Sequence, residues 1–582
     1  MSGSGVPDFL ALRKGFAAQN EVDLAASGIQ EAAAEVTSAK PSTTSTTSKG
    51  KTPGRPKGST NKKRKADDVP GEPRMGTRRS NRTATQLVNA KDEEERLRIE
   101  AEAQAKAAEE AARFEEEQRI AKHGDREIEA QSSVIGASDT ASLRETLKEL
   151  AALKLEETKE DPELGKRPAL GTKKLQEKTK DLELRAIVKV IPERIYSMTV
   201  HPDPQRDLVF VGDKTGHLSL WDCTNAGKRT IKASANGSIR DGAKPKKMDE
   251  DDEEGAEGEA EEDEYQWGKW WVWQGHMAHS VSGIKFRPNE TKQVYSSSYD
   301  CTVRTHHFER GISEEVIDAD VWGDEALIHA FDFDATGNEI WASDNNGGLI
   351  FRDLREPKEN AKRWDVDGHK IGCVSLNPAN PRLAVTAHLK RYMRLWDLSL
   401  LRGLPTDTPT DEILDKALLH EYAHEKACSA AYFDPTGTRV ASTSYDDAIR
   451  VWDVDPKKTS DYPEGGKWKP SKKITHNCQV GRYVTVLRAH WSTVPSYPPH
   501  LHIGNMARTL DVLSPDGTAV KHFTNDAITA VPAVTASHPT VGGKFYGGAA
   551  SGKVSFWTEP LNEDDDEEEE KVKGEAKKEE DE

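Results

Sequence analysis

The chain has 582 residues, of which only 35% are hydrophobic and 31% are charged, and its formal net charge is -18. Several domains fit this length, but with so few apolar residues a sizeable part of the chain cannot bury enough surface to fold. The sequence contains no run of about 18 apolar residues and no basic start followed by an apolar stretch, so we expect neither a membrane span nor secretion.

The cysteines are odd in number and widely spaced, at Cys223, Cys301, Cys373, Cys428 and Cys478. None forms the Cys-x-x-Cys pair that zinc and redox sites use. We therefore expect reduced thiols in a nucleus or cytoplasm, with no metal and no cofactor.

Charge is distributed along the chain in blocks of opposite sign. Residues 249–264 contain twelve acids and no base, and residues 559–582 contain fourteen acids against four lysines. Residues 49–82 instead carry twelve Lys or Arg against three acids, a local charge of +9. We expect this basic segment to bind a polyanion, whereas the acidic blocks either bind histones or only solvate the chain.

The N-terminal part changes composition before the repeats begin. Residues 1–90, rich in Ser, Thr, Lys and Gly without apolar periodicity, are predicted to be a disordered basic region. Residues 91–122 lack Gly and Pro and pair opposite charges four residues apart, which predicts an exposed charged helix rather than a coiled coil. Residues 123–183 are predicted to be a linker with short helical pieces.

Two short motifs lie in the basic region. Residues 52–58, Thr-Pro-Gly-Arg-Pro-Lys-Gly, resemble an AT-hook, in which Arg55 enters a narrow A·T-rich minor groove and Lys57 neutralises phosphate. The basic cluster that follows is typical of a nuclear localisation signal and consists of Lys62, Lys63, Arg64 and Lys65. We expect a nuclear protein whose basic segment also contacts DNA phosphates.

From about residue 184 the chain changes to short β-rich runs in which one pattern recurs. Segments ending in Trp-Asp or an equivalent pair fall at positions 221, 306, 352, 396, 452, 510 and 557. Six intervals separate these seven units, and the longest contains the acidic insert at 227–264, so the spacing fits WD repeats with loop insertions. The pattern predicts an all-β, seven-bladed propeller over residues 184–558, closed by residues 185–192 as the outer strand of the last blade and followed by the acidic tail 559–582.

A combination of Ser, His and Asp occurs in the fifth unit, where His424, Ser442 or Ser444, and Asp446 precede Trp452. In a WD blade these residue types form a buried hydrogen-bonded network. No nucleophile elbow or phosphate loop accompanies them in the sequence. We therefore expect no catalytic residues and no enzymatic activity.

Basic residues stand in the loops between the expected strands. Lys370 follows His369 at the start of one unit, and Lys390 and Arg391 stand in a turn where other units have Asp. Comparable loop or strand-end positions are occupied by Lys426, Arg482 and Arg488. Scattered surface lysines usually only solvate a protein. At position 390, however, lysine cannot make the local hydrogen bond that Asp makes in other units, and such a departure from the local pattern favours a functional role.

Two segments, residues 369–398 and 476–491, resemble the damaged-DNA-binding WD-repeat family. That family includes the small subunit of the UV-damaged-DNA-binding complex, WD-repeat protein seventy-six and fungal relatives. The resemblance implies a nuclear protein that binds double- and single-stranded DNA, prefers ultraviolet-damaged DNA and has no catalytic activity.

The resemblance also implies site residues. Lys370 matches a lysine that contacts DNA, and residues 481–483 match a hairpin that fills the gap left by a flipped lesion. Gly481 stands where the hairpin has an aromatic residue, which leaves Arg482 and Tyr483 to stack on a base. A purely structural role for Tyr483 is the alternative.

Relatives of this family include receptors that dock on cullin-type ubiquitin ligases through a Trp-Asp-x-Arg ending. Asp353 and Arg355 match its Asp and Arg, whereas Arg352 replaces the Trp. The alternative function is therefore a chromatin or ubiquitin-ligase interaction scaffold, which would bind histones or a cullin adaptor and have DNA affinity only through its basic tail.

Overall fold

The computed structural model describes residues 122–131, 136–153, 165–227, 267–323, 326–457, 468–481 and 483–560, together with single helical residues between 98 and 113. The described residues from 100 onward belong to one compact unit. Those between 98 and 113 are helical and exposed, and Lys106 pairs with Glu102 at 2.8 Å.

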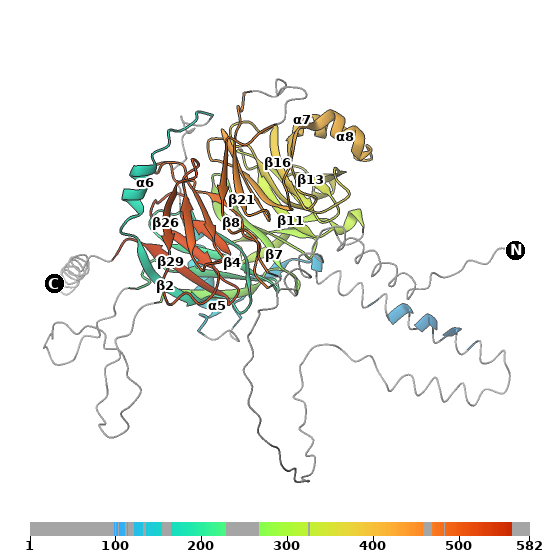
Figure 1. Ribbon diagram of the computed structural model, residues 1–582. Coiled ribbons are helices and arrows are strands. Elements are labelled where there is room, and N and C mark those ends of the chain that lie inside the picture. Colours follow the sequence, from blue (N-terminus) through green and yellow to red (C-terminus); the bar gives the residue numbers. More distant parts are fainter. Residues whose placement is uncertain are drawn as a thin grey trace, which may run out of the picture. The chain divides into compact units, whose positions relative to one another are not determined.

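Seven antiparallel sheets surround a common axis and form a seven-bladed β-propeller (Figure 1). The first three blades are built from β3 (Ile195–Val200), β4 (Leu208–Asp213), β5 (His217–Asp222) and β6 (Lys269–Gln274); β7 (Val281–Arg287), β8 (Glu290–Ser298), β9 (Thr302–His307) and β10 (Ile312–Asp318); and β11 (Ile328–Phe333), β12 (Glu339–Asp344), β13 (Gly348–Asp353) and β14 (Lys362–Asp365).

The fourth to seventh blades repeat this order. They are built from β15 (Ile371–Leu376), β16 (Leu383–His388), β17 (Tyr392–Asp397) and β18 (Leu418–Ala423); β19 (Cys428–Phe433), β20 (Arg439–Ser444), β21 (Ala448–Asp453) and β22 (Lys472–Thr475); β23 (His490–Trp491), β24 (Leu501–Gly504), β25 (Leu510–Leu513) and β26 (Ala519–Phe523); and β27 (Val534–Ser537), β28 (Phe545–Gly548), β29 (Lys553–Thr558) and β2 (Glu183–Lys189). The predicted fold class is confirmed, and all seven predicted unit ends lie on the third strand of a blade.

The second strands of the blades lie in the middle of the sheets and are covered by neighbouring blades, which explains their composition. Every residue of β4, with the sequence Leu-Val-Phe-Val-Gly-Asp, is buried, and so is every residue of β16. A strand buried on both faces favours a continuous run of β-branched and aromatic residues over alternation of apolar and polar ones. The repeat is therefore visible in the turns and strand ends rather than in a period of two.

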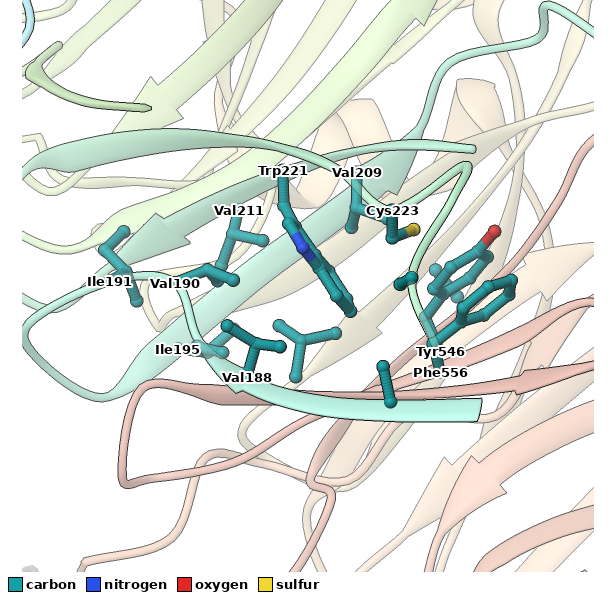
Figure 2. Close-up of a cluster of buried hydrophobic side chains, with 14 of the residues drawn as sticks. Val188, Val190, Ile191, Ile195, Val209, Val211, Trp221, Cys223, Tyr546 and Phe556 are labelled. Carbon is teal, nitrogen blue, oxygen red and sulfur yellow. The ribbon is translucent and has the colours of Figure 1, made fainter. Parts of the chain in front are cut away.

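The ring is closed by β2, which pairs antiparallel with β29 from Glu183 opposite Thr558 to Lys189 opposite Lys553. This confirms the predicted closing strand. The joint also has an apolar core, in which Val188 and Trp221 pack with Phe556 and other buried residues of blades one and seven (Figure 2). This strand from the other end of the domain covers the outer edge of β29 and completes blade seven.

The segment 123–183 differs from the predicted linker, because its described parts pack on the propeller. In α5 (Thr140–Ala152), Leu143, Leu147 and Leu150 form one buried stripe against blades one and two. The shorter α6 (Thr172–Thr179) buries Leu175 and lies beside β26. A stripe of three leucines gives a weak sequence signal, which is why only short helical pieces were predicted. Neither helix is long and apolar enough to cross a membrane.

A short strand extends blade two outward. Strand β1 (Arg126–Glu127) pairs with β10, and the buried Arg304 donates hydrogen bonds to the carbonyl oxygens of Lys122 at 3.1 Å and Gly124 at 2.6 Å. A guanidinium supplies several donors in a fixed plane, so one side chain holds this whole segment on the blade. The strands of the seven blades run from Glu183 to Thr558, close to the predicted bounds of 184–558, and the segment from residue 122 packs on the outside of blade two.

All five cysteines are buried and free of disulfides, as the sequence predicts. Burial raises the pKa of the Cys478 thiol to about 12. A thiol with so high a pKa is almost entirely protonated near neutral pH and hence a poor nucleophile.

We expect the propeller to lose stability in mild acid, because several buried histidines are held neutral. Burial lowers the pKa of His201 and His500 to about 4 and that of His490 to about 3. Between the usual histidine pKa of about 6.5 and these values, the unfolded chain binds protons that the folded chain excludes. The free energy of unfolding should therefore fall as pH decreases from about 6.5 to about 4.

Denaturant titrations across this pH range measure the slope, that is, how steeply the free energy of unfolding falls with pH. His490→Phe should reduce it, whereas His279→Phe, at an exposed position, should not. A slope that is the same in both variants would contradict the assignment to buried rings.

Candidate nucleic-acid interface

Strand order places two kinds of connection at the same end of the propeller. In each blade the first strand starts, the second ends and the third starts at this end, so the interblade loops and the turns between second and third strands meet there. Backbone hydrogen bonds join them, as from Leu389 to Lys370 and from Tyr445 to Ala427, both at 3.0 Å. We call this end the mouth face and the other end the opposite face.

The predicted DNA-binding residues of the propeller all belong to mouth-face connections. The described ones are Lys370, Lys390, Arg391, Lys426, Tyr483 and Arg488. Three of these cations are exposed, Lys370 and Arg488 are half-buried, and Tyr483 is 79% exposed. The remaining predicted residues lie outside the described ones: Arg55, Lys57, Lys62, Lys63, Arg64, Lys65 and Arg482.

A left-handed residue occurs at the same place in all seven mouth-face turns. These residues are Gly216, Cys301, Gly347, Arg391, Asp447, Arg508 and Gly552. For Arg391 (φ 78°) and Arg508 (φ 65°), this conformation costs about 1 to 2 kcal/mol, which glycine would avoid. The sequence prediction missed Arg508, although it stands where other units have Gly.

The turn of blade four has a lysine where the turns of blades two and five have a carboxylate. In blade two the equivalent Asp300 accepts from the Thr302 amide at 3.0 Å, and in blade five Asp446 accepts from the Glu425 amide at 3.2 Å. Lys390 occupies this position with an exposed side chain. The turn therefore presents a cation to solvent where its equivalents bind their own backbone.

The interblade loop before β23 positions Arg488. The Thr485 hydroxyl donates to the Ile195 carbonyl of blade one at 2.7 Å, and the Ala489 amide donates to the Thr443 hydroxyl of blade five at 3.0 Å. The loop thus reaches past blade seven. With it, Val486 and Arg488 line an axial cavity of about 440 Å³.

Aromatic residues from three blades gather around this position. The rings of Tyr299 and His329 lie 4.5 Å apart, and those of Tyr196 and Tyr299 lie 6.2 Å apart. Arg194 donates to the Tyr196 hydroxyl at 2.7 Å. Sequence reasoning missed all four residues, because each is ordinary within its own repeat and only the ring brings them together.

Charge at the mouth is positive and uncompensated. Burial, with added repulsion from Arg488, lowers the pKa of Lys370 to about 8. Burial also lowers the pKa of His329 to about 2, and both cations contribute to this shift. Within the part of the chain that the structure describes, no carboxylate forms an ion pair with Lys370 or Arg488, whereas Lys285 in the cavity wall pairs with Asp332 at 2.6 Å.

The possible catalytic set of blade five is a buried structural network. Ser442 Oγ lies 3.3 Å from His424 Nε2, and Arg450, rather than Trp452, continues the network to Asp446 at 2.8 Å. Burial and the Arg450 charge lower the pKa of His424 to about 3. A ring with so low a pKa is a poor general base at neutral pH.

The predicted docking residues lie on the opposite face, after β13. Arg355 donates to both carboxylate oxygens of Asp353, at 2.9 and 2.6 Å, and its side chain is 64% exposed. Arg352 is buried and donates to the Glu356 carbonyl at 2.7 Å, so it takes the place of the expected Trp inside the blade end.

One group of residues among those described lies close enough to bind a metal ion, at the edge of blade two: His123, Asp318 and Asp320. Lys122 pairs with Asp320, and His123 Nδ1 lies 2.5 Å from Glu315 Oε2. Basic side chains of the chain itself thus compensate these carboxylates, and the group ties down the segment before β1.

This arrangement defines a WD-repeat β-propeller with a basic and aromatic loop face. Residues 269–306 and 416–453 match the family described as WD domain, G-beta repeat. Each match contains the outer strand of one blade and the first three strands of the next, so each repeat holds two neighbouring blades together.

Curated relatives identify the particular family. A DNA damage-binding protein CMR1 of Cryptococcus neoformans is 33% identical over 440 residues, covering 66% of this chain and 71% of that protein. Proteins of the same name from Aspergillus clavatus (33% over 419 residues, 70% and 73% covered) and Mycosarcoma maydis (28% over 626 residues, 88% and 94% covered) are also similar. The chain belongs to the family of DNA damage-binding proteins CMR1.

The mutual repulsion at the mouth gives a direct test of this geometry. We expect Arg488→Met to raise the pKa of Lys370 toward its ordinary value, because the repulsion is removed while the lysine stays partly buried. The pH dependence of Lys370 acetylation, followed by mass spectrometry, measures the change. The control is Lys214, an exposed lysine of the blade-one turn whose profile should not change.

Proposed function

We propose that the chain binds double- and single-stranded DNA through its mouth face, prefers ultraviolet-damaged DNA and catalyses no reaction. The observation that carries the proposal is the pair Lys370 and Arg488, half-buried at the mouth without a carboxylate partner. Buried charges are normally paired, because an unpaired one is costly to desolvate. The relatives are named for binding damaged DNA, which supports the same conclusion.

Affinity and damage preference have different physical sources. Exposed cations such as Lys390, Arg391 and Lys426 attract phosphates of any sequence. Extruding a base costs less at a lesion than in an intact duplex, so a side chain that occupies the vacated space favours damage. Tyr483 is exposed on the loop beside Arg488 and presents a ring for such stacking.

We expect Lys370→Glu to weaken binding to damaged and undamaged DNA alike, on the order of tenfold, because repulsion replaces attraction at a phosphate. Tyr483→Ala should mainly lower the ratio of damaged to undamaged affinity, with a stacking loss of about 1 to 3 kcal/mol. Binding isotherms of the full chain on irradiated and intact duplexes with 5′-hydroxyl ends, at one salt concentration, measure both effects.

The matched control for the tyrosine is Tyr392→Ala, a half-buried position beside the blade-four turn. An unchanged affinity ratio in Tyr483→Ala would remove this residue from damage sensing. If Lys370→Glu changes neither affinity, the mouth face does not bind DNA, and the alternative of tail-mediated affinity gains support.

The basic segment is proposed to add non-specific affinity and to direct the chain to the nucleus. Deleting residues 49–82 should weaken binding to undamaged DNA and flatten its salt dependence, since each lost phosphate contact reduces the slope by about 0.9. Titrations at several salt concentrations measure the slope, and a fluorescent fusion reports nuclear entry. A slope equal to that of the intact chain would exclude phosphate contacts by this segment.

A second proposal is docking on a cullin-ligase adaptor through Asp353 and Arg355. Their bidentate pair lies on the opposite face, so a partner there leaves the mouth face free. Asp353→Ala with Arg355→Ala should abolish co-purification with the adaptor and leave DNA binding and folding intact, because exposed ion pairs contribute little to stability. If the unaltered chain does not co-purify with the adaptor, the docking proposal fails.

A further inference from the structure

Buried arginines on the third strands of the blades have partners within the chain, either carbonyl oxygens, as for Arg304, or carboxylates. Arg394 pairs with Glu421 at 2.7 Å and Arg450 with Asp446 at 2.8 Å. Lys370 and Arg488 have no carboxylate partner among the described residues; Arg488 lies beside the Tyr432 hydroxyl, and its charge lowers the pKa of Lys370. The fold therefore keeps two like charges together, which is unfavourable unless an anion binds between them.

A neutral polar group faces the same place. His329 is only 4% exposed, and its Nδ1 has no hydrogen-bond partner. With its pKa lowered to about 2, the ring is neutral near pH 7 and can donate one hydrogen bond to an anion's oxygen without adding charge. An unsatisfied buried nitrogen normally costs free energy, which an acceptor bound beside the two cations would recover.

The surrounding structure is rigid enough to hold a small ligand. Arg488 is fixed between blades five and one by the bonds of Thr485 and Ala489. Arg488 also lines the axial cavity of about 440 Å³, a volume within the range of ordinary small-molecule sites, whereas Lys370 and His329 are not among the residues that line it. The ligand's anionic group thus meets the cations at the mouth, and its remainder has room either in the cavity or outside it.

We propose that the axial mouth is a binding site for a phosphate monoester, held by Lys370 and Arg488 with His329 Nδ1 as an additional donor. Two cations match the two charges of a monoester, whereas an internal phosphodiester carries one charge. A terminal phosphate also enters a recess end-on, while an internal one has chain on both sides and stays on the surface. The phosphate monoester belongs either to a small phosphate compound or to the end of a DNA strand.

The site uses the same two cations as the proposed DNA interface and so rests on that proposal, but it can be tested separately from damage preference. Calorimetric titration of the full chain with inorganic phosphate, at constant ionic strength, should show saturable binding. Lys370→Met and Arg488→Met should each weaken it by about tenfold or more, since hydrogen bonds to charged groups are lost. Lys214→Met, which removes an exposed lysine on the same face, should leave it unchanged.

A second measurement needs no variant. Phosphate should protect Lys370 from acetylation in the unaltered chain, while Lys214 continues to react. This readout holds even if Arg488→Met impairs folding, which thermal unfolding of each variant will reveal. Absence of both saturable binding and protection overturns the proposal, and so does equal weakening by Lys214→Met, which would indicate general charge attraction.

The two sources are separated with gapped duplexes that differ only in a 5′-phosphate or 5′-hydroxyl at the gap. Stronger binding of the phosphorylated duplex, lost in Lys370→Met, identifies a strand terminus as the ligand. Equal binding of both duplexes, together with saturable inorganic phosphate, identifies a small phosphate compound. Damage preference is measured on duplexes with hydroxyl ends, so either proposal can fail while the other stands.

Discussion

Ring closure is the constraint on which the rest of the structure depends. The ladder between β2 and β29, with the apolar joint around Trp221, connects the start of the propeller to its end. Without it, the strand starts of blades one to seven would not be held around one axis, and residues from blades one, two, three, four and six would not meet at the mouth. The site is thus a property of the closed ring, since no single blade contains more than a fraction of it.

The sequence predicts what repeats and misses what is unique. Seven strand ends, from Trp221 to Trp557, were predicted because turn chemistry recurs at the same offset in each blade. The docked helix α5 was missed because it occurs once and its leucine stripe is short. A weak sequence pattern can be recognised when it recurs in seven units. A helix that occurs once has only its own three leucines to indicate it.

The candidate site was likewise predicted only where its residues depart from the repeat pattern. Lys370 and Lys390 stood out because they break a pattern within their own units, but the pKa of Lys370 also depends on the charge of Arg488, over a hundred positions away in the chain. His329 and Tyr299 break no pattern at all, and their significance comes from lying close enough to Arg488 for its charge to lower the pKa of both. The departure at Arg508 was visible as an arginine at a glycine position, yet the degenerate sixth unit obscured the alignment.

The closing ladder also determines how the propeller bears mechanical load. Glu183 and Thr558 are paired at the same end of an antiparallel ladder, so tension applied between the flanking segments would unzip its hydrogen bonds one after another instead of shearing them together. Helix α6 would carry this load before the ladder does, because both of its ends are bonded to blade six. Thr172 donates to Asp516 at 3.1 Å, and Lys521 donates to the Lys180 carbonyl at 2.7 Å. Force entering from the N-terminal side is therefore transferred to blade six first, and the closing ladder is shielded by a helix that takes no part in the repeat.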